Sequence, residues 1–254
     1  MRTWILVGLM VGAAGVARAL DTDDLVLYAP MDEGAGVTAA DLSATGAVGD
    51  VFGDATWTPD GYMGGAMVFA GDGRIEFAEN AALNLIEQLT MVGWIFPTAA
   101  PADTNLFGRR NAANQGGYTM QWTANKVEVW VHFGGWTGTR GTQALVPEID
   151  EWHFVAAGYD GSNVFQYVDG QLDSEVAAGG DADEVAEVFR IGQAQTGLGA
   201  MPGIIDEVAV YSRALTPDEL EDIHANGVLP LAVKAQGKAA TRWATLKGAT
   251  LKAR

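Results

Sequence analysis

The sequence contains no cysteine and only three histidines. The lack of cysteine excludes disulfide bonds, thiol nucleophiles and thiolate zinc sites. The histidines, His132, His153 and His224, form no His-x-His or His-Glu-x-x-His motif, so no histidine-based zinc site is indicated. A Gly-x-Ser-x-Gly nucleophile motif is missing as well. A fold with these absences must be stabilised by its hydrophobic core, alone or together with a bound metal.

Positive charge is scarce and unevenly placed. The chain has 15 lysines and arginines against 32 aspartates and glutamates, a net charge of −17. Six of the basic residues lie in residues 228–254, which contain no acid, so the remainder has nine basic against 32 acidic side chains. Such a body repels nucleic acid and anionic polymers and suits divalent cations or neutral partners such as glycans. The basic tail is interpreted as a solvated chain end, with a tether to an anionic surface as the alternative.

No long hydrophobic run follows the first residues of the chain. The opening MRTWILVGLMVGAAGVARAL has a basic Arg2, an apolar stretch from Trp4 to Val16 and a small-residue cleavage signal ending at Ala19. This pattern is typical of a secretory signal peptide, and its apolar stretch is too short for a transmembrane helix. We therefore expect a signal peptide at 1–19, a domain at 20–227 and a tail at 228–254. The mature chain is expected to be secreted or to lie in a bacterial periplasm or on a cell surface.

Between the signal peptide and the tail, apolar residues recur at every second position or in short runs. Such stretches, separated by glycine-containing turns, are typical of β-strands. The predicted strands are Leu25–Pro30, Ala66–Ala70, Arg74–Ala78, Met91–Pro97, Asn105–Arg109, Tyr118–Trp122, Lys126–Phe133, His153–Tyr159, Asn163–Val168, Gln171–Val176, Val188–Gly192 and Ile204–Tyr211. Asp-Gly pairs at 160–161 and 169–170 bracket one of these strands, which indicates a hairpin.

One helix is expected near the end of this region. Thr216 and Glu219 have the spacing of a capping box, Pro217 suits the first helical position, and Asn226-Gly227 is a stop signal. Many closely spaced strands with no helices between them indicate an all-β fold. The sequence therefore predicts a two-sheet antiparallel jelly-roll sandwich with a short C-terminal helix.

Five segments carry a resemblance to a known family. In chain order they are LVLYAPMDEGAGVTAADLSATG, GGAMVFAGDGRIEF, LTMVGWIFPT, DEWHFVAAGYDGSNVFQYVDGQL and GIIDEVAVYSRALTPDELEDI. Together they resemble the bacterial laminin-G-like domains of the concanavalin A-like lectin/glucanase superfamily, over about residues 25–225. The resemblance implies a concanavalin A-like jelly roll and, more often than catalysis, ligand binding or adhesion. It does not identify a ligand, because one fold serves many functions.

The last predicted strand contains an unexpected acid. Alternation places Asp206 on one face with Ile204, Val208 and Val210, and Glu207 on the other. A carboxylate on a core-facing side needs a partner. Glu207 is expected to pair with a neighbouring strand or with solvent.

The resemblance implies such a partner for Asp206, because calcium in this superfamily often joins the early chain to the last strand. The other ligands would be carboxylates or carbonyls near Asp32-Glu33 and near Gly71-Asp72. Calcium binds several hard oxygen ligands, carboxylates and main-chain carbonyls among them. We therefore expect a structural calcium site with Asp206, Asp32 and Asp72. The alternative is that Asp206 is hydrated at the end of its strand or hydrogen-bonded to a turn.

Tryptophans supply a candidate ligand surface. If the valines of KVEVWVHF face inward, Trp130 and His132 face the opposite way, Trp136 follows in a glycine-rich turn, and Trp122 lies on the preceding strand. Exposed indole rings stack on the apolar faces of sugars. Arg109 is expected beside them, and the other residues expected to border this surface are Phe107, Arg110 and Asn111. The alternative is that both sheet faces are covered and these rings belong to the core, as we expect for Trp57 and Trp94.

These observations favour a secreted, non-catalytic module that binds an extracellular glycan, with a surface protein as the alternative partner. A glycan hydrolase of the same superfamily is the second alternative. Its Glu-x-Asp-x-x-Glu pattern is matched by Glu148 and Asp150, but His153 replaces the final glutamate. Hydrolysis with retention needs two carboxyl groups across the scissile bond. We therefore interpret this segment as the turn before the strand at His153.

Overall fold

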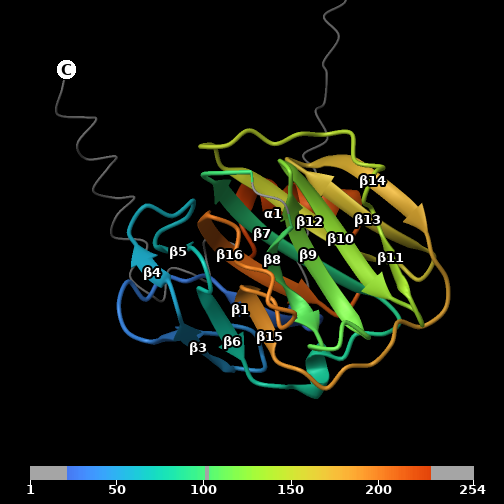
Figure 1. Ribbon diagram of the computed structural model, residues 1–254, viewed down its shortest axis with the longest axis horizontal. Coiled ribbons are helices and arrows are strands. Elements are labelled where there is room, and N and C mark those ends of the chain that lie inside the picture. The colour runs from blue at the N-terminus through green and yellow to red at the C-terminus, as the bar shows by residue number, and fades with distance from the viewer. Residues whose placement is uncertain (1–21, 101–102, 230–254) are drawn as a thin grey trace, which may run out of the picture.

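The computed structural model describes residues 22–100 and 103–229, which form two antiparallel eight-stranded sheets packed face to face (Figure 1). Sheet A has the strand order β14-β13-β12-β7-β16-β5-β4, and β1 also pairs with β16. Sheet B has the order β11-β10-β9-β8-β15-β6-β3-β2. The expected jelly-roll sandwich is thereby confirmed. The predicted signal peptide and almost all of the predicted tail lie outside the described residues.

The strands of sheet A are β1 (Leu25–Ala29), β4 (Ala55–Thr58), β5 (Ala66–Phe69), β7 (Leu89–Pro97), β12 (His153–Tyr159), β13 (Asn163–Val168), β14 (Gln171–Ala177) and β16 (Gly203–Tyr211). Those of sheet B are β2 (Thr38–Ala40), β3 (Val48–Phe52), β6 (Arg74–Phe77), β8 (Thr104–Arg110), β9 (Gly117–Thr123), β10 (Lys126–His132), β11 (Trp136–Gly138) and β15 (Phe189–Gly192). A 3-10 turn, η1 (Ala81–Leu83), and the helix α1 (Pro217–Asn226) complete the fold.

All twelve predicted strands are present, within about two residues at each end, as boundaries from sequence usually are. The four strands that the sequence did not reveal are β2, β3, β4 and β11. Three of them are three or four residues long, and β3 is mostly exposed, with only Gly49 buried. A short strand at or near a sheet edge buries too little of one face to leave a clear period-two pattern.

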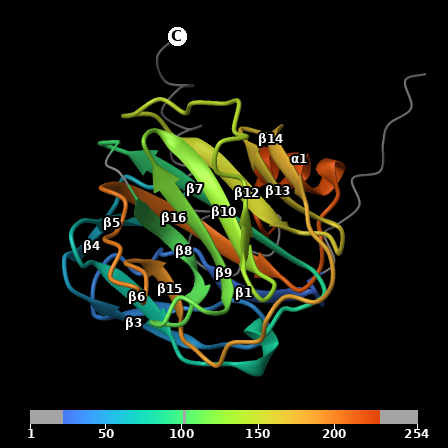
Figure 2. The ribbon, with the colours of Figure 1, turned by 45° about the vertical axis from the view of Figure 1, so that its right-hand side comes forward.

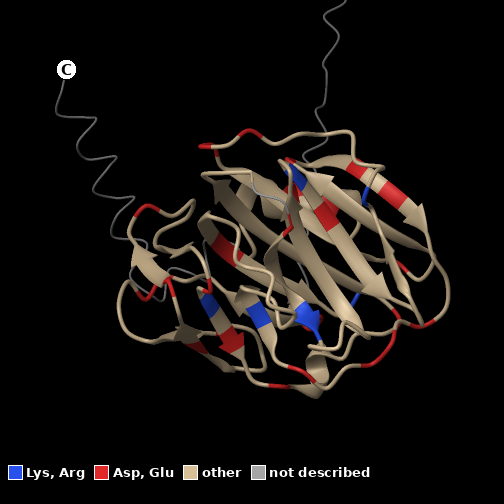
Figure 3. Ribbon diagram, viewed as in Figure 1, with Lys and Arg blue, Asp and Glu red and all other residues tan. Residues whose placement is uncertain are grey.

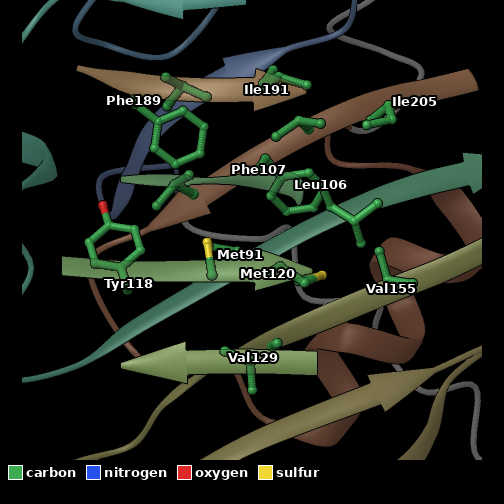
Figure 4. Close-up of a cluster of buried hydrophobic side chains, with 14 of the residues drawn as sticks. Met91, Leu106, Phe107, Tyr118, Met120, Val129, Val155, Phe189, Ile191 and Ile205 are labelled. Carbon is green, nitrogen blue, oxygen red and sulfur yellow. The ribbon is translucent and has the colours of Figure 1, made fainter. Parts of the chain in front are cut away.

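The main core lies between the two sheets. It is built from aliphatic, methionine and aromatic side chains on the inner faces, including Phe107, Met120 and Ile205 (Figure 4). A second cluster lies between the other face of sheet A and α1 (Figure 2). It contains Leu220 and Ile223 of the helix together with Trp94 of β7. This second cluster also includes Val228 and Leu229. The packed body therefore extends two residues past the boundary predicted at 227.

The helix α1 begins and ends where the sequence indicates. The Thr216 hydroxyl accepts from the Glu219 N–H and the Glu219 carboxylate accepts from the Thr216 N–H at 2.9 Å, a complete capping box. Arg213 binds the same carboxylate with two nitrogens, at 2.8 and 2.9 Å. This pairing lowers the pKa of Glu219 to about 2. No helix of the described residues is long and apolar enough to cross a membrane.

Candidate functional site

The acidic pair Asp206-Glu207 lies in a bulge of β16. The register against β7 shifts between Asp206 and Ala209, and Glu207 has a positive φ of 54°. An extra residue in a bulge reverses the alternation of side chains that follows it. The prediction that Asp206 shares a face with Val208 and Val210 is therefore wrong. Asp206 is paired with Trp94 on the side of sheet A away from sheet B, whereas Val208 and Val210 belong to the core between the sheets.

Two other strands meet at this bulge. Along one edge of β16, β5 pairs with residues 203–205 and β1 pairs with residues 208–211. Both run antiparallel to β16. The end of β1 and the start of β5 therefore converge beside residues 206 and 207 of β16, with which neither strand pairs. Asp32 follows β1, and a glycine-rich loop, Asp60–Gly65, precedes β5. Asp32 therefore lies beside Asp206, as expected.

The prediction that Asp72 joins this site is wrong. Asp72 follows β5 and consequently lies at the opposite end of that strand from the bulge. Its Oδ1 instead accepts from the Asp54 N–H at 3.3 Å, in the adjacent turn. The turn that does reach Asp206 is the Asp60–Gly65 loop, whose Met63 N–H donates to Asp206 Oδ2 at 2.9 Å.

Asp206 is completely buried, and its environment is negative. Oδ1 has no hydrogen-bond partner among the described residues. Burial, the charge of Glu207 and, to a smaller degree, that of Asp32 raise the pKa of Asp206 to about 8. Glu207 is also fully buried and accepts from the Tyr28 hydroxyl at 2.5 Å, so it pairs with a neighbouring strand as expected. A carboxylate oxygen left without a donor in such a place is unfavourable.

These residues fit the chemistry of a hard divalent cation. Asp206 offers the unpaired Oδ1, and the exposed Asp32 supplies a second carboxylate beside the Asp60–Gly65 loop, whose Gly65 N–H donates to Asp32 Oδ1 at 2.8 Å. Calcium completes its shell with main-chain carbonyls and water. The described residues contain no cluster of three acids or histidines of metal-binding geometry, so carbonyls would have to make up the remainder.

The second candidate region is the face of sheet B away from sheet A, which we call the outer face. Cross-strand register places one row of residues across the whole sheet on it: Thr38, Asp50, Glu76, Arg190, Gly108, Thr119, Trp130 and Gly138. The Trp130 ring lies directly over Gly138, where any Cβ would meet the indole carbons at 2.4 Å. Trp130 is thus half-buried and packed against β11.

A neighbouring row on the outer face brings an arginine, a histidine and a tryptophan together. Arg110 is paired with Gly117 on β9, and His132 is paired with Trp136 on β11. Because Gly117 has no side chain, Arg110 reaches across β9, and its guanidinium carbon lies 4.9 Å from the centroid of the half-buried Trp136 ring. The His132 ring meets the same indole edge to face at 5.0 Å. The structure therefore joins His132 and Trp136, as expected, and adds Arg110.

Hydrogen bonds fix this Arg110–His132–Trp136 cluster. The Trp136 Nε1–H donates to the Asn114 carbonyl at 2.9 Å, and Arg110 donates to the Asn114 side-chain oxygen. His132 Nδ1 lies 2.5 Å from Asp183 Oδ2, which also accepts from the Gly134 N–H. These two contacts lower the pKa of Asp183. Asp183 is 51 residues from His132 in the chain, and no motif in the sequence connects the two.

Three residues expected on the ligand surface point inward instead. Trp122 is fully buried, and its Nε1–H donates to the Ala99 carbonyl at 2.9 Å. Phe107 belongs to the core between the sheets. Arg109 is 1% exposed and donates to the Asn80 carbonyl at 3.3 Å. Trp122 is paired with Val127 and Arg109 with Tyr118, and both partners face the core. The prediction that Trp122 and Arg109 contact a ligand is wrong for that reason.

Two carboxylates of the outer face, those of Glu76 and Glu128, form ion pairs with arginines. Glu76 binds Arg74 at 2.7 Å and Arg190 at 2.6 Å. Glu128 accepts from Arg140 at 2.9 Å and from Gln143 at 3.1 Å. Neither is placed as a free acid or nucleophile.

The residues of the hydrolase-like pattern lie elsewhere. Glu148 and Asp150 are exposed in the turn before β12, which confirms that interpretation of the segment. His153 is held between Asp169 Oδ2 at 2.8 Å and the Glu148 carbonyl at 2.9 Å.

Comparisons with solved structures show the same fold in binding domains. Domain 4 of AbnA, a GH43 extracellular arabinanase from Geobacillus stearothermophilus, in complex with arabinotriose, is 20% identical, with a TM-score of 0.64 over 79% of this chain and 98% of that one. The binding domain of Paraclostridial Mosquitocidal Protein 1 is 15% identical, with a TM-score of 0.63 over 80% of this chain and 52% of that one.

The binding domain of Botulinum neurotoxin DC, in complex with rat synaptotagmin II, is 13% identical, with a TM-score of 0.61 over 80% of this chain and 52% of that one. This chain thus spans about half the length of the two toxin domains. No curated protein matches the sequence. A family model described as the concanavalin A-like lectin/glucanases superfamily matches residues 69–221, which is more than half of the chain. With the two-sheet jelly roll, this match shows that the chain belongs to the concanavalin A-like lectin/glucanase superfamily.

Proposed function

We propose that this protein is a non-catalytic module that binds an extracellular glycan on the outer face of sheet B. The observation that carries the proposal is the pair of half-buried tryptophans, Trp130 and Trp136, held at neighbouring positions beside Arg110 and His132. Indole rings fixed in one orientation provide apolar stacking area for a sugar at little entropic cost. The adjacent guanidinium and imidazole supply the polar contacts that a sugar hydroxyl needs.

Two further points support a binding role over catalysis. Glu76 and Glu128 on the outer face are paired with arginines, so neither is a free carboxyl group for glycoside hydrolysis. A protein of the same fold binds arabinotriose. At 20% identity that likeness concerns the fold, and no ligand contact is transferred from it.

A structural calcium ion belongs to the same proposal. Asp206 and Asp32 would hold it between the end of β1 and the Asp60–Gly65 loop. The bound cation would supply the positive charge that the buried Asp206 carboxylate lacks. Because β1, β5 and β16 meet at this point, occupancy would fix three strands and the loop relative to one another.

The stacking role predicts a selective effect of Trp136→Ala. We expect this variant to bind a recognised oligosaccharide about 2 kcal/mol more weakly, roughly thirtyfold in Kd, because a central aromatic contact is removed. The measurement is calorimetric titration with a ligand selected on a glycan array. Trp57→Ala is the matched control, since Trp57 is also half-buried and its Nε1–H also donates to a carbonyl at 2.9 Å, but on β4 of the other sheet.

The stacking role is contradicted if Trp136→Ala and Trp57→Ala lose the same amount of oligosaccharide affinity, or if Trp136→Ala loses none. If the array shows no saccharide binding at all, the proposed function is wrong. A surface protein would then be the partner to test.

A further inference from the structure

The few positive side chains of this acidic protein are concentrated on one face. Residues 22–229 contain seven lysines and arginines: Arg74, Arg109, Arg110, Lys126, Arg140, Arg190 and Arg213. Four of them occupy outward positions on the strands of sheet B (Figure 3). The guanidinium carbon of Arg140 lies 5.6 Å from the centroid of the Trp130 ring. The outer face of sheet B is therefore the place where an anion meets the least repulsion.

Arg110 differs from its neighbours on this face. Arg74 and Arg190 bind Glu76, and Arg140 binds Glu128 and Asp103. Arg110 forms no ion pair with any described residue, although it is only 7% exposed. Its Nε has no hydrogen-bond partner within residues 22–100 and 103–229. A buried guanidinium without a counter-charge is unfavourable, and burial lowers its pKa accordingly.

The surroundings of Arg110 suit an oxygen anion. Among the described residues, the guanidinium of Arg110 donates one hydrogen bond, to the side-chain oxygen of Asn114. This oxygen is a neutral acceptor on an exposed loop. The Trp136 ring packs against the guanidinium and restricts its orientation. Asp183, the acid of the cluster, is occupied by His132 and the Gly134 N–H. A planar, oriented guanidinium of this kind binds a carboxylate with two parallel hydrogen bonds.

We propose that the glycan bound on the outer face is acidic, and that Arg110 recognises the carboxylate of a uronic acid while Trp136 stacks on the sugar. This inference rests on the proposed function and assigns its ligand class. The carboxylate would replace the Asn114 oxygen on Arg110 and would reach the unpaired Nε. The negative charge of the whole chain does not prevent this contact, because exposed charges are screened over about 8 Å at physiological ionic strength.

The test measures the binding of three sets of oligosaccharides of equal length to the whole protein. The first set contains uronic-acid oligomers of the galacturonate, mannuronate and glucuronate types. The second contains their methyl esters, which keep the ring and remove the charge, and the third contains sulfated oligomers. We expect a uronate to bind roughly ten- to a hundredfold more tightly than its ester, the range for hydrogen bonds to a charged group.

Variants identify the residue responsible. Arg110→Gln should remove the preference for acid over ester, while Arg110→Lys should keep only part of it, because lysine is a point charge without the planar fork. Arg74→Gln is the matched control. Arg74 is also on the outer face and lies 4.8 Å from the Phe52 centroid, but it is paired with Glu76. Its replacement should leave the preference unchanged. Thermal melting establishes that each variant is folded.

The outcomes separate this inference from the function on which it rests. Equal binding of acid and ester, or stronger binding of the sulfated set, overturns the assignment to uronic acids and leaves glycan binding intact. A preference for acid that survives in Arg110→Gln overturns the role of Arg110. If neither these sets nor a panel of neutral oligosaccharides binds, the proposed function itself is wrong.

Discussion

Metal-free protein is expected to lose stability as the pH rises from about 4 to about 8. Asp206 has a pKa of about 8 in the folded chain, against an ordinary value of 3.8. Between these values the folded state holds a proton that the unfolded state has released, so each pH unit lowers the free energy of unfolding by roughly 1.4 kcal/mol. Below this window Asp206 has no effect, and above it the loss is complete. The measurement is chemical denaturation at several pH values in a chelator.

The variant Asp206→Asn isolates this effect. Its amide cannot ionise, so at pH 8 without metal it should be more stable than the native chain. His153 also loses stabilising charge as the pH rises, since pairing with Asp169 raises its pKa above 6.5, but that contribution is common to both proteins and cancels in their difference. Glu219, with a pKa of about 2, acts only at lower pH. Parallel pH profiles for the two proteins would contradict the buried-carboxylate account.

Calcium gives the same experiment a second readout. A cation beside Asp206 favours its ionised form, so calcium should remove the loss of stability at pH 8. At about a hundred times the dissociation constant it should add roughly 2.7 kcal/mol. Asp206→Asn should show no such gain. If calcium does not change the stability of the native protein at pH 8, Asp206 is a buried acid that binds no metal.

Trp122→Ala is expected to destabilise the fold by about 3–5 kcal/mol, the range for removing a fully buried aromatic side chain. Trp122 is fully buried between the sheets, and the Ala99 carbonyl would also lose its donor. Thermal or chemical denaturation measures the effect. Binding per folded molecule should be unchanged, because the ring does not reach the outer face.

Trp130→Ala is the matched control for this prediction. Trp130 lies on β10, the strand that pairs with the β9 strand of Trp122, but its ring lies outward and half-exposed over Gly138. Its removal should cost much less stability than the removal of Trp122. If the two variants are equally destabilised, the division of these tryptophans between core and surface is wrong.

Most of the fold could be predicted because the long strands keep their alternation. The valines of β10 face inward as expected, and Trp130 and His132 face outward. The inward direction of Trp122 follows from its pairing with Val127, and that pairing depends on a hairpin register that spacing alone did not fix. The prediction for Arg109 failed for the same reason. Its polar character suggests a surface position, but its register pairs it with the core-facing Tyr118.

The site at β16 was only half predictable. The energetic cost of burying Asp206 was visible in the sequence, and the family resemblance indicated Asp32 as its neighbour. The bulge was not visible, because Asp-Glu followed by Val-Ala-Val is also a regular strand pattern. Asp72 could be excluded only by knowing which end of β5 lies beside Asp206, and that is a property of the topology.

The meeting of β1 and β5 on one edge of β16 has a consequence for how the chain folds. Leu25 is paired with Tyr211, so the first and last strands of the domain are neighbours. Contacts of such long sequence separation require large loops to close before they contribute, which places folding on the order of milliseconds to seconds. Asp32 and Asp206 come together only after that closure. A cation held there would act mainly on the rate of unfolding, because it stabilises a junction that is completed late.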